Sequence, residues 1–191
     1  DHKGILIEGR AGTGKSYVVN MISSILKRVQ RLAPTNKAAL HIKGKTIHKF
    51  LKMDKKGQIS REWLDIAKER YDYIVIDEIS MITRDIWKRL VELKRATDIT
   101  FILVGDHRQC PPVEEDCGME DYFNHPAVKY LANYNKVELT VMHRYDQKLW
   151  DLLEDVQVID PSAFGTKLCN KNICFYNKTR KYVNDLLMGQ N

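Results

Sequence analysis

Eight residues near the start of the chain have the types and spacing of a phosphate-binding loop. The segment Gly9–Ser16 fits the pattern G-x-x-x-x-G-K-[ST] in full, between the apolar run Ile5–Ile7 and a helical stretch that starts at Ser16. In such a loop the backbone N–H groups wrap phosphates, the lysine reaches the β- and γ-phosphates, and the serine ligates Mg²⁺. A chance match is expected in about 1% of chains of this length. The segment predicts a nucleoside triphosphate site built from Gly12, Thr13, Gly14, Lys15 and Ser16.

A pair of carboxylates follows the apolar run Tyr73–Ile76, which is typical of a strand buried on both faces. Acidic residues at the carboxyl end of a parallel strand lie where α/β sheets bind ligands. We expect Asp77 to hold Mg²⁺ and Glu78 to orient the attacking water or accept its proton. In isolation the pair is equally typical of a strand end or a helix cap. The phosphate-binding loop upstream favours the hydrolytic interpretation.

A polar loop, Gly105–Pro112, follows the next apolar run, Ile99–Val104. The amide of Gln109 has the chemistry to donate to a γ-phosphate and to accept from the attacking water. It could therefore sense hydrolysis. Taken alone, the segment has the composition of an ordinary Gly/Pro loop.

Alternating apolar runs and helical stretches must position these side chains. We expect an α/β fold with a mainly parallel sheet and right-handed crossovers. The expected strands are 5–7, 29–33, 73–76, 99–104, 137–140 and 173–176. The expected helices are 16–28, 37–42, 60–70, one that starts near 83, 147–156 and 178–188, with Ser60 and Thr83 as candidate caps.

Charge is spread unevenly along the 191 residues, whose net charge is +6. Residues 1–60 hold 13 Lys/Arg against 3 Asp/Glu, whereas residues 61–191 hold 18 against 22. A basic half suggests a polyanionic partner, and a solvated surface is the alternative.

Composition argues against two further classes of protein. No apolar run approaches the roughly 20 residues that a bilayer-spanning helix needs, and the apolar run near residue 1 is too short for a signal-peptide core. We therefore expect an intracellular chain without a membrane segment. The spacing of Cys110, Cys117, Cys169 and Cys174 misses the two close pairs of a zinc ribbon.

The ordered set of segments resembles superfamily 1 helicases, most closely the Pif (petite integration frequency) type and its RecD-like relatives. The resemblance covers nearly the whole chain. Beyond Gly9–Ser16, the matching segments are 33–39 (motif Ia), 46–50 (Ib), 76–81 (II), 105–113 (III) and 139–144 (IV), together with 177–180 and 183–184 in the second domain.

The resemblance implies a RecA-like P-loop fold, with residues 1–140 as a first RecA-like domain and 141–191 as the start of a second. It implies ATP and Mg²⁺ as cofactors, and 5′→3′ translocation on single-stranded DNA with unwinding at duplex junctions during replication, recombination or repair. Arg144 would be an arginine finger, a surface ion-pair arginine being the alternative. The DNA-contacting positions would be Thr35, Asn36, Thr46 and His48, with Lys37 and Lys49 adding charge.

Some residues depart from the Pif-type pattern. Three residues, Asn36, His107 and Cys110, differ from those usual at the same motif positions. They resemble the residues found in helicases of large DNA viruses or phages. Segments matching motifs V and VI are missing, as is the adenine-binding glutamine expected before motif I. We therefore expect an incomplete motor that binds ATP and hydrolyses it poorly, acting in the nucleus, the cytoplasm or a viral replication site.

Three alternatives stay open at this point. A viral superfamily 1 RNA helicase shares these motifs, although the residues of Asp77–Met81 favour a DNA helicase. A non-translocating P-loop ATPase switch would more typically show a sensor Asn after the third strand than Gln109. A passive DNA-binding module would not need Lys15 or Glu78 at all.

Overall fold

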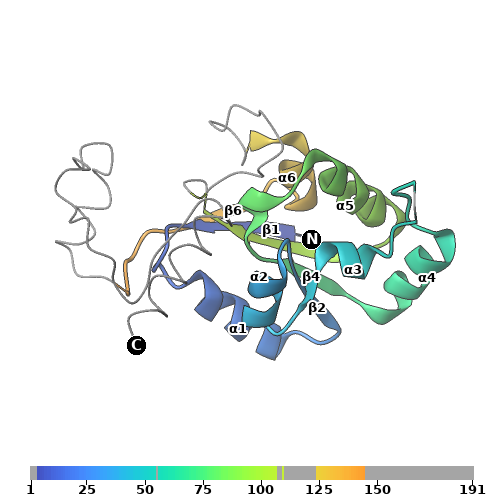
Figure 1. Ribbon diagram of the computed structural model, residues 1–191. Helices are drawn as coiled ribbons and strands as arrows, with labels where there is room; N and C mark the ends of the chain where they lie inside the picture. Colours follow the sequence, from blue (N-terminus) through green and yellow to red (C-terminus); the bar gives the residue numbers. More distant parts are fainter. Residues whose placement is uncertain (1–3, 55, 107–108, 110–123, 145–191) are drawn as a thin grey trace, which may run out of the picture. The chain divides into compact units, whose positions relative to one another are not determined.

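The computed structural model describes residues 4–54, 56–106, 109 and 124–144. Within them, six strands form one parallel sheet in the order β3-β2-β4-β5-β1-β6 (Figure 1). The central strands β4, β5 and β1 are apolar and almost entirely buried, as a sheet covered on both faces requires. The strands are β1 Gly4–Gly9, β2 Val29–Ala33, β3 Lys45–Thr46, β4 Tyr73–Ile76, β5 Thr100–Gly105 and β6 Lys136–Leu139.

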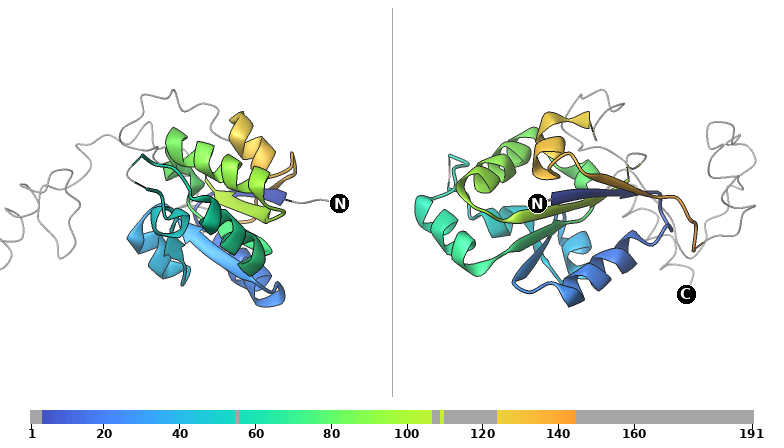
Figure 2. Two further views of the ribbon diagram at one scale, coloured as in Figure 1. Left: turned by 90° about the vertical axis from the view of Figure 1, so that its right-hand side faces the viewer. Right: turned by 180° about the vertical axis from the view of Figure 1, so that it is seen from behind.

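Helices cover both faces of the sheet (Figure 2). Side chains alternate along β4, so that Ile74 and Ile76 enter one apolar core while Val75 enters the other. The larger core packs against α3 Ile47–Leu51, α4 Arg61–Arg70, α5 Arg84–Ala96 and α6 Pro126–Leu131. The opposite face is covered by α1 Lys15–Ile25 and α2 Asn36–His41, and a short 3₁₀ helix, η1 Ile79–Met81, follows β4.

An aromatic cluster anchors the larger core. The ring of Phe50, which is 2% exposed, lies edge-on to Trp63 and Tyr71 with both centroid separations at 5.6 Å. Such edge-to-face pairs add about 0.5–1.5 kcal/mol beyond the burial of their area. The cluster therefore fixes α3, which carries His48 and Lys49, against α4.

Hydroxyl side chains start three of the helices. Thr35, Thr46 and Ser60 each accept a hydrogen bond from the N–H three residues later. The predicted helix from Ser60 to Arg70 is confirmed. The helix after Thr83 also forms, but the Thr83 side chain makes no capping hydrogen bond.

Several predicted boundaries were wrong. The first helix ends at Ile25 rather than at residue 28, because Leu26 adopts an extended conformation with φ −79° and ψ 145°. Strand β3, at Lys45–Thr46, was not among the predicted strands, and it pairs with β2. Helix α6, for which no pattern was recognised, has Pro126 in its first turn and His125 as its cap.

The first compact unit of the chain ends at Tyr145. The predicted second domain lies outside the described residues apart from 141–144, so the division after residue 140 stays a prediction. The segments predicted at 147–156, 173–176 and 178–188 lie outside them as well. Among the described helices, none has the length and apolar character needed to cross a bilayer.

Gly44 provides a test of how β3 is positioned. A Cβ at this residue would overlap the backbone carbonyl of Arg31 in β2, which cannot move without disturbing the sheet. We expect Gly44→Ala to lower the free energy of unfolding by about 1–3 kcal/mol, the usual cost of overpacking. Chemical denaturation measures the change, with Leu40→Ala on exposed α2 surface as the control. An unchanged midpoint for Gly44→Ala would contradict this packing.

Candidate nucleotide and nucleic-acid site

The phosphate-binding loop connects β1 to α1 at the carboxyl edge of the sheet. Gly12 and Gly14 adopt φ values of 94° and 90°, a region that side chains with a Cβ rarely occupy. Between them, the Thr13 hydroxyl donates to the carbonyl of Arg10 at 2.8 Å and closes the turn. The helix N-terminus at Lys15 therefore faces the loop, which is the arrangement that favours an anion.

The Lys15 ammonium is buried and held by backbone oxygens. Its Nζ donates to the carbonyls of Gly9 at 2.6 Å and Arg10 at 3.0 Å, and lies 3.9 Å from Oδ2 of Asp106. Burial lowers the pKa of Lys15, while the carboxylates of Asp106, Glu78 and Asp77 oppose that shift. The cationic form is thus supported by negative charge on several sides.

Asp77 and Glu78 follow β4 directly. Asp77 is 6% exposed, and its Oδ1 accepts the N–H of Glu78 at 2.9 Å. Glu78 has a left-handed φ of 56°, a strained conformation for a residue other than glycine. Among the residues described, none hydrogen-bonds the buried Glu78 Oε2.

Burial raises the pKa of both carboxyl groups. For Asp77 the N–H of Glu78 and the charge of Lys15 oppose the increase. For Glu78 the neighbouring negative charge of Asp77 adds to it. The pair therefore favours a bound cation, because positive charge would relieve both the burial cost and the mutual repulsion.

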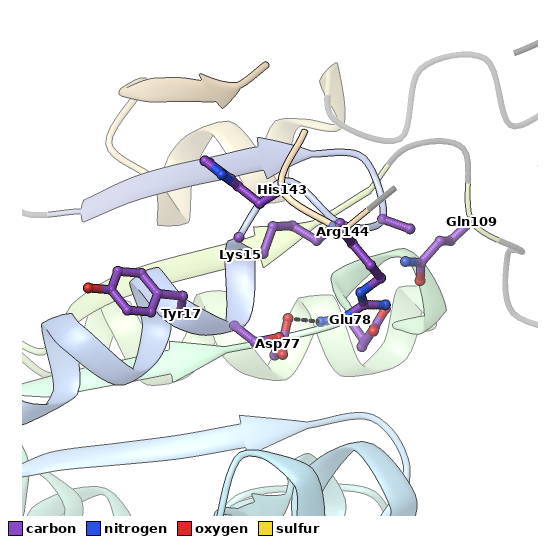
Figure 3. A pocket seen from close by; sticks show the side chains of 11 residues that line it. Lys15, Tyr17, Asp77, Glu78, Gln109, His143 and Arg144 are labelled. Carbon is purple, nitrogen blue, oxygen red and sulfur yellow. Dashed lines mark hydrogen bonds between the residues drawn. The ribbon is translucent and has the colours of Figure 1, made fainter. Parts of the chain in front are cut away.

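A pocket of about 450 Å³ brings the predicted catalytic side chains together (Figure 3). Its wall comes from the ends of the adjacent strands β4, β5 and β1, where α/β sheets bind ligands. Gln109 enters the pocket from the turn after β5. The N–H of Gln109 donates to the carbonyl of Asp106 at 3.1 Å and closes this turn. The lining residues include Lys15, Ser16, Asp77, Glu78, Gln109 and Arg144.

Residues 142–144, which follow β6, lie directly on the phosphate-binding loop. The N–H of His143 donates to the carbonyl of Gly12 at 3.0 Å. A Cβ added at Gly12 would come within 2.7 Å of Met142 Sδ and 2.9 Å of Arg144 Cβ. Arg144 is thereby held at the pocket by backbone contacts of the first compact unit, although its side chain remains exposed.

The residues present fit a magnesium ion. The predicted ligands Ser16 and Asp77 line the same pocket, and the carboxyl group of Asp77 is desolvated. Mg²⁺ typically takes one or two protein ligands and completes its shell with water and phosphate oxygens. Across the described ranges, no three His, Cys, Asp or Glu side chains gather as an all-protein metal cage would require.

The six predicted nucleic-acid residues gather at the carboxyl ends of β2 and β3. Thr35, Asn36 and Lys37 form the start of α2, and Thr46, His48 and Lys49 form the start of α3. The parallel register pairs Ala33 with Thr46, so the two helix starts are neighbours. The threonines are half-buried caps, while the other four side chains are exposed.

Two residues of the site had not been recognised from the sequence. Asp106 follows β5 as Asp77 follows β4, and this shared strand-end pattern was the available signal. Tyr17 lines the pocket from the first turn of α1, and no sequence signal distinguishes it. His107, Cys110, Tyr145 and the segments at 177–180 and 183–184 lie outside the described residues.

A family model described as "AAA domain" matches residues 2–161. Curated relatives include ATP-dependent DNA helicase PIF1 of Xenopus laevis, 30% identical over 82% of this chain and 28% of the relative. The same protein of Saccharomyces cerevisiae is 32% identical over 82% of this chain and 20% of the relative. The chain thus spans about a quarter of the length of the curated relatives that it matches.

Solved structures of Pif1 helicases share the fold. The Pif1 helicase from Candida albicans has a TM-score of 0.73 and 22% identity over 98% of this chain and 51% of that chain. Bacteroides Pif1 bound to ssDNA has a TM-score of 0.71 and 20% identity over 95% of this chain and 52% of that chain. These likenesses confirm the predicted α/β, RecA-like P-loop fold. Because the family model matches most of the chain, the chain belongs to the AAA domain family, and its relatives are Pif1-type helicases, as the motifs had predicted.

Proposed function

We propose that this chain is the ATP-binding first motor domain, with the start of a second, of an ATP-dependent DNA helicase that moves along single-stranded DNA. One observation carries the proposal. The phosphate-binding loop, the carboxylates Asp77 and Glu78, and Gln109 and Arg144 line a single pocket. The relatives are named ATP-dependent DNA helicases, which supports the same assignment.

In the proposed mechanism, ATP phosphates replace the backbone oxygens that now hold Lys15. The ammonium would turn from the carbonyls of Gly9 and Arg10 towards the β- and γ-phosphates, whose charge compensates it more fully. Ser16 and Asp77 would hold Mg²⁺, which neutralises charge developing on the phosphate oxygens when bound. Loop N–H groups and the start of α1 add fixed positive dipoles.

Glu78 is suited to act on the attacking water. Its buried Oε2 is unpaired among the described residues, and its raised pKa makes the carboxylate a stronger base than an ordinary glutamate. The water oxygen would bond to the γ-phosphorus as the bond to the leaving ADP oxygen breaks, with the water proton passing to Glu78. Gln109 would orient the water, and Arg144 would stabilise negative charge on the transferred group.

Single-stranded DNA would lie across the starts of α2 and α3. Thr35, Asn36, Thr46 and His48 would contact its backbone, with Lys37 and Lys49 nearby. The hydroxyl oxygens of Thr35 and Thr46 each accept a backbone N–H. Each hydroxyl can at the same time donate its own hydrogen to a phosphate oxygen. Translocation from 5′ to 3′, action at duplex junctions, and roles in replication, recombination or repair rest on the family resemblance. A nuclear, cytoplasmic or viral setting stays a prediction.

Two other functions predict different behaviour. A viral RNA helicase would be stimulated by RNA rather than DNA, and a non-translocating ATPase switch would hydrolyse ATP without moving along a strand. The exposed basic and polar residues at the starts of α2 and α3, on strands next to the catalytic carboxylates, favour the translocase.

Glu78→Gln tests the hydrolytic role. The amide keeps the size of the side chain but cannot accept the proton, so we expect ATP hydrolysis in the full-length protein to fall about 10²–10⁴-fold while ATP binding persists. Steady-state hydrolysis and equilibrium ATP binding measure the two properties. Wild-type hydrolysis by this variant would overturn the mechanism.

The pH profile provides an independent readout of the same role. Because burial raises the pKa of Glu78, its active carboxylate is lost as pH falls through that raised value. We expect the acidic limb of kcat/KM to lie above the ordinary glutamate pKa of about 4.3 and to disappear in the residual activity of Glu78→Gln. An acidic limb that is identical in both proteins would assign it to another group.

Lys37→Ala combined with Lys49→Ala tests the proposed DNA surface. Each lysine that neutralises a phosphate of single-stranded DNA contributes about 0.7 to the slope of log affinity against log salt. We expect the slope to fall by about 1.4 for the double variant, measured by fluorescence anisotropy with an oligonucleotide. Lys88→Ala, on the exposed face of α5, is the control. An unchanged slope for the double variant would place the DNA elsewhere.

A further inference from the structure

The nucleotide pocket has two chemically different ends. One end holds the carboxylate, amide and guanidinium of Glu78, Gln109 and Arg144, which suit the chemistry of a γ-phosphate. The other end is lined by the aromatic ring of Tyr17. Figure 3 shows Tyr17 and Gln109 on opposite sides of Lys15.

Tyr17 has no evident structural task. It occupies the first turn of α1, which packs on the sheet through Val18, Val19 and Ile22 instead. The Tyr17 side chain is 73% exposed, and within the described part of the chain it has neither a hydrogen bond nor a ring contact. A large exposed ring on the rim of a polar pocket gains most by being covered by a ligand.

The direction of a bound nucleotide follows from the loop. If the γ-phosphate faces Glu78 and the β-phosphate lies over the loop at Lys15, the ribose and base must extend away from Glu78. That direction leads towards the Tyr17 end of the pocket. We propose that the ring of Tyr17 is the platform on which the base of the bound nucleotide stacks, an inference that rests on the proposed ATPase function.

Stacking on an aromatic ring has a defined specificity. Every nucleobase offers a π-face, so the ring adds affinity without distinguishing adenine from guanine. A purine covers more of the ring than a pyrimidine does, and Tyr17 should therefore favour ATP and GTP over CTP and UTP. The hydroxyl of Tyr17 is not needed for this role, which separates stacking from a hydrogen bond to the ribose.

The test compares two probes on the 191-residue chain, Mg²⁺ with ATP and Mg²⁺ with inorganic triphosphate, both titrated by calorimetry. We expect Tyr17→Ala to weaken ATP binding about tenfold, which lies within the range for removal of one base–aromatic stack. Triphosphate should bind equally to both proteins because it lacks a base. Tyr17→Phe should bind ATP as the unchanged chain does. Ile25→Ala, an exposed position at the far end of α1, is the control.

Unchanged ATP affinity in Tyr17→Ala would overturn the platform while leaving the phosphate site intact. Equal weakening of ATP and triphosphate binding would also overturn it, because the loss would then arise at the phosphate site rather than at the base. Loss of ATP affinity in Tyr17→Phe would assign the contact to the hydroxyl and also overturn it. If the unchanged chain bound neither probe, the proposed function would fail and the platform with it.

Discussion

The ammonium group of Lys15 lies buried near Asp106, Asp77 and Glu78, at the carboxyl ends of three adjacent strands. Burying a cation without negative partners is costly, and so is burying several carboxylates without positive charge. Among the described residues, the Lys15 ammonium has its ion-pair partner at the long distance of 3.9 Å, at Oδ2 of Asp106. The buried cation suits a ligand that carries phosphates, and the buried carboxyl groups of Asp77 and Glu78 suit a metal ion.

The parallel sheet places this charged site beside the proposed DNA surface. Strand β4, which Asp77 follows, is hydrogen-bonded to β2, and the N–H of Asp77 donates to the carbonyl of Leu32 at 2.9 Å. Three residues after Leu32, Thr35 caps α2. A short covalent and hydrogen-bonded path therefore joins Asp77 to the start of α2, which is part of the proposed DNA surface. On the other side, residues 142–144 contact Gly12 and connect the loop to the chain that continues from β6.

The sequence allowed the local parts of this site to be predicted, because their signals lie within a few residues. The pattern Gly9–Ser16, the run Tyr73–Ile76 and the acidic pair after it each describe one strand and its turn. What escaped prediction depends on approach between distant segments. The two-residue β3 exists only through pairing with β2, and the approach of Met142 to Gly12 depends on where the chain after β6 meets the loop. Tyr17 is close to the loop in sequence, but no sequence signal distinguishes it. Phe50, in the segment that matches motif Ib, is buried against Trp63 and Tyr71 because its helix packs inward.

The central claim is that Lys15 serves a bound triphosphate rather than the fold alone. Calorimetric titration of Mg²⁺ with ATP into this chain and into Lys15→Ala tests it most directly. A charged hydrogen bond contributes about 1.5–3 kcal/mol, so the folded variant should bind ATP about 10–100-fold more weakly. Equal ATP affinity in the two folded proteins would contradict the claim.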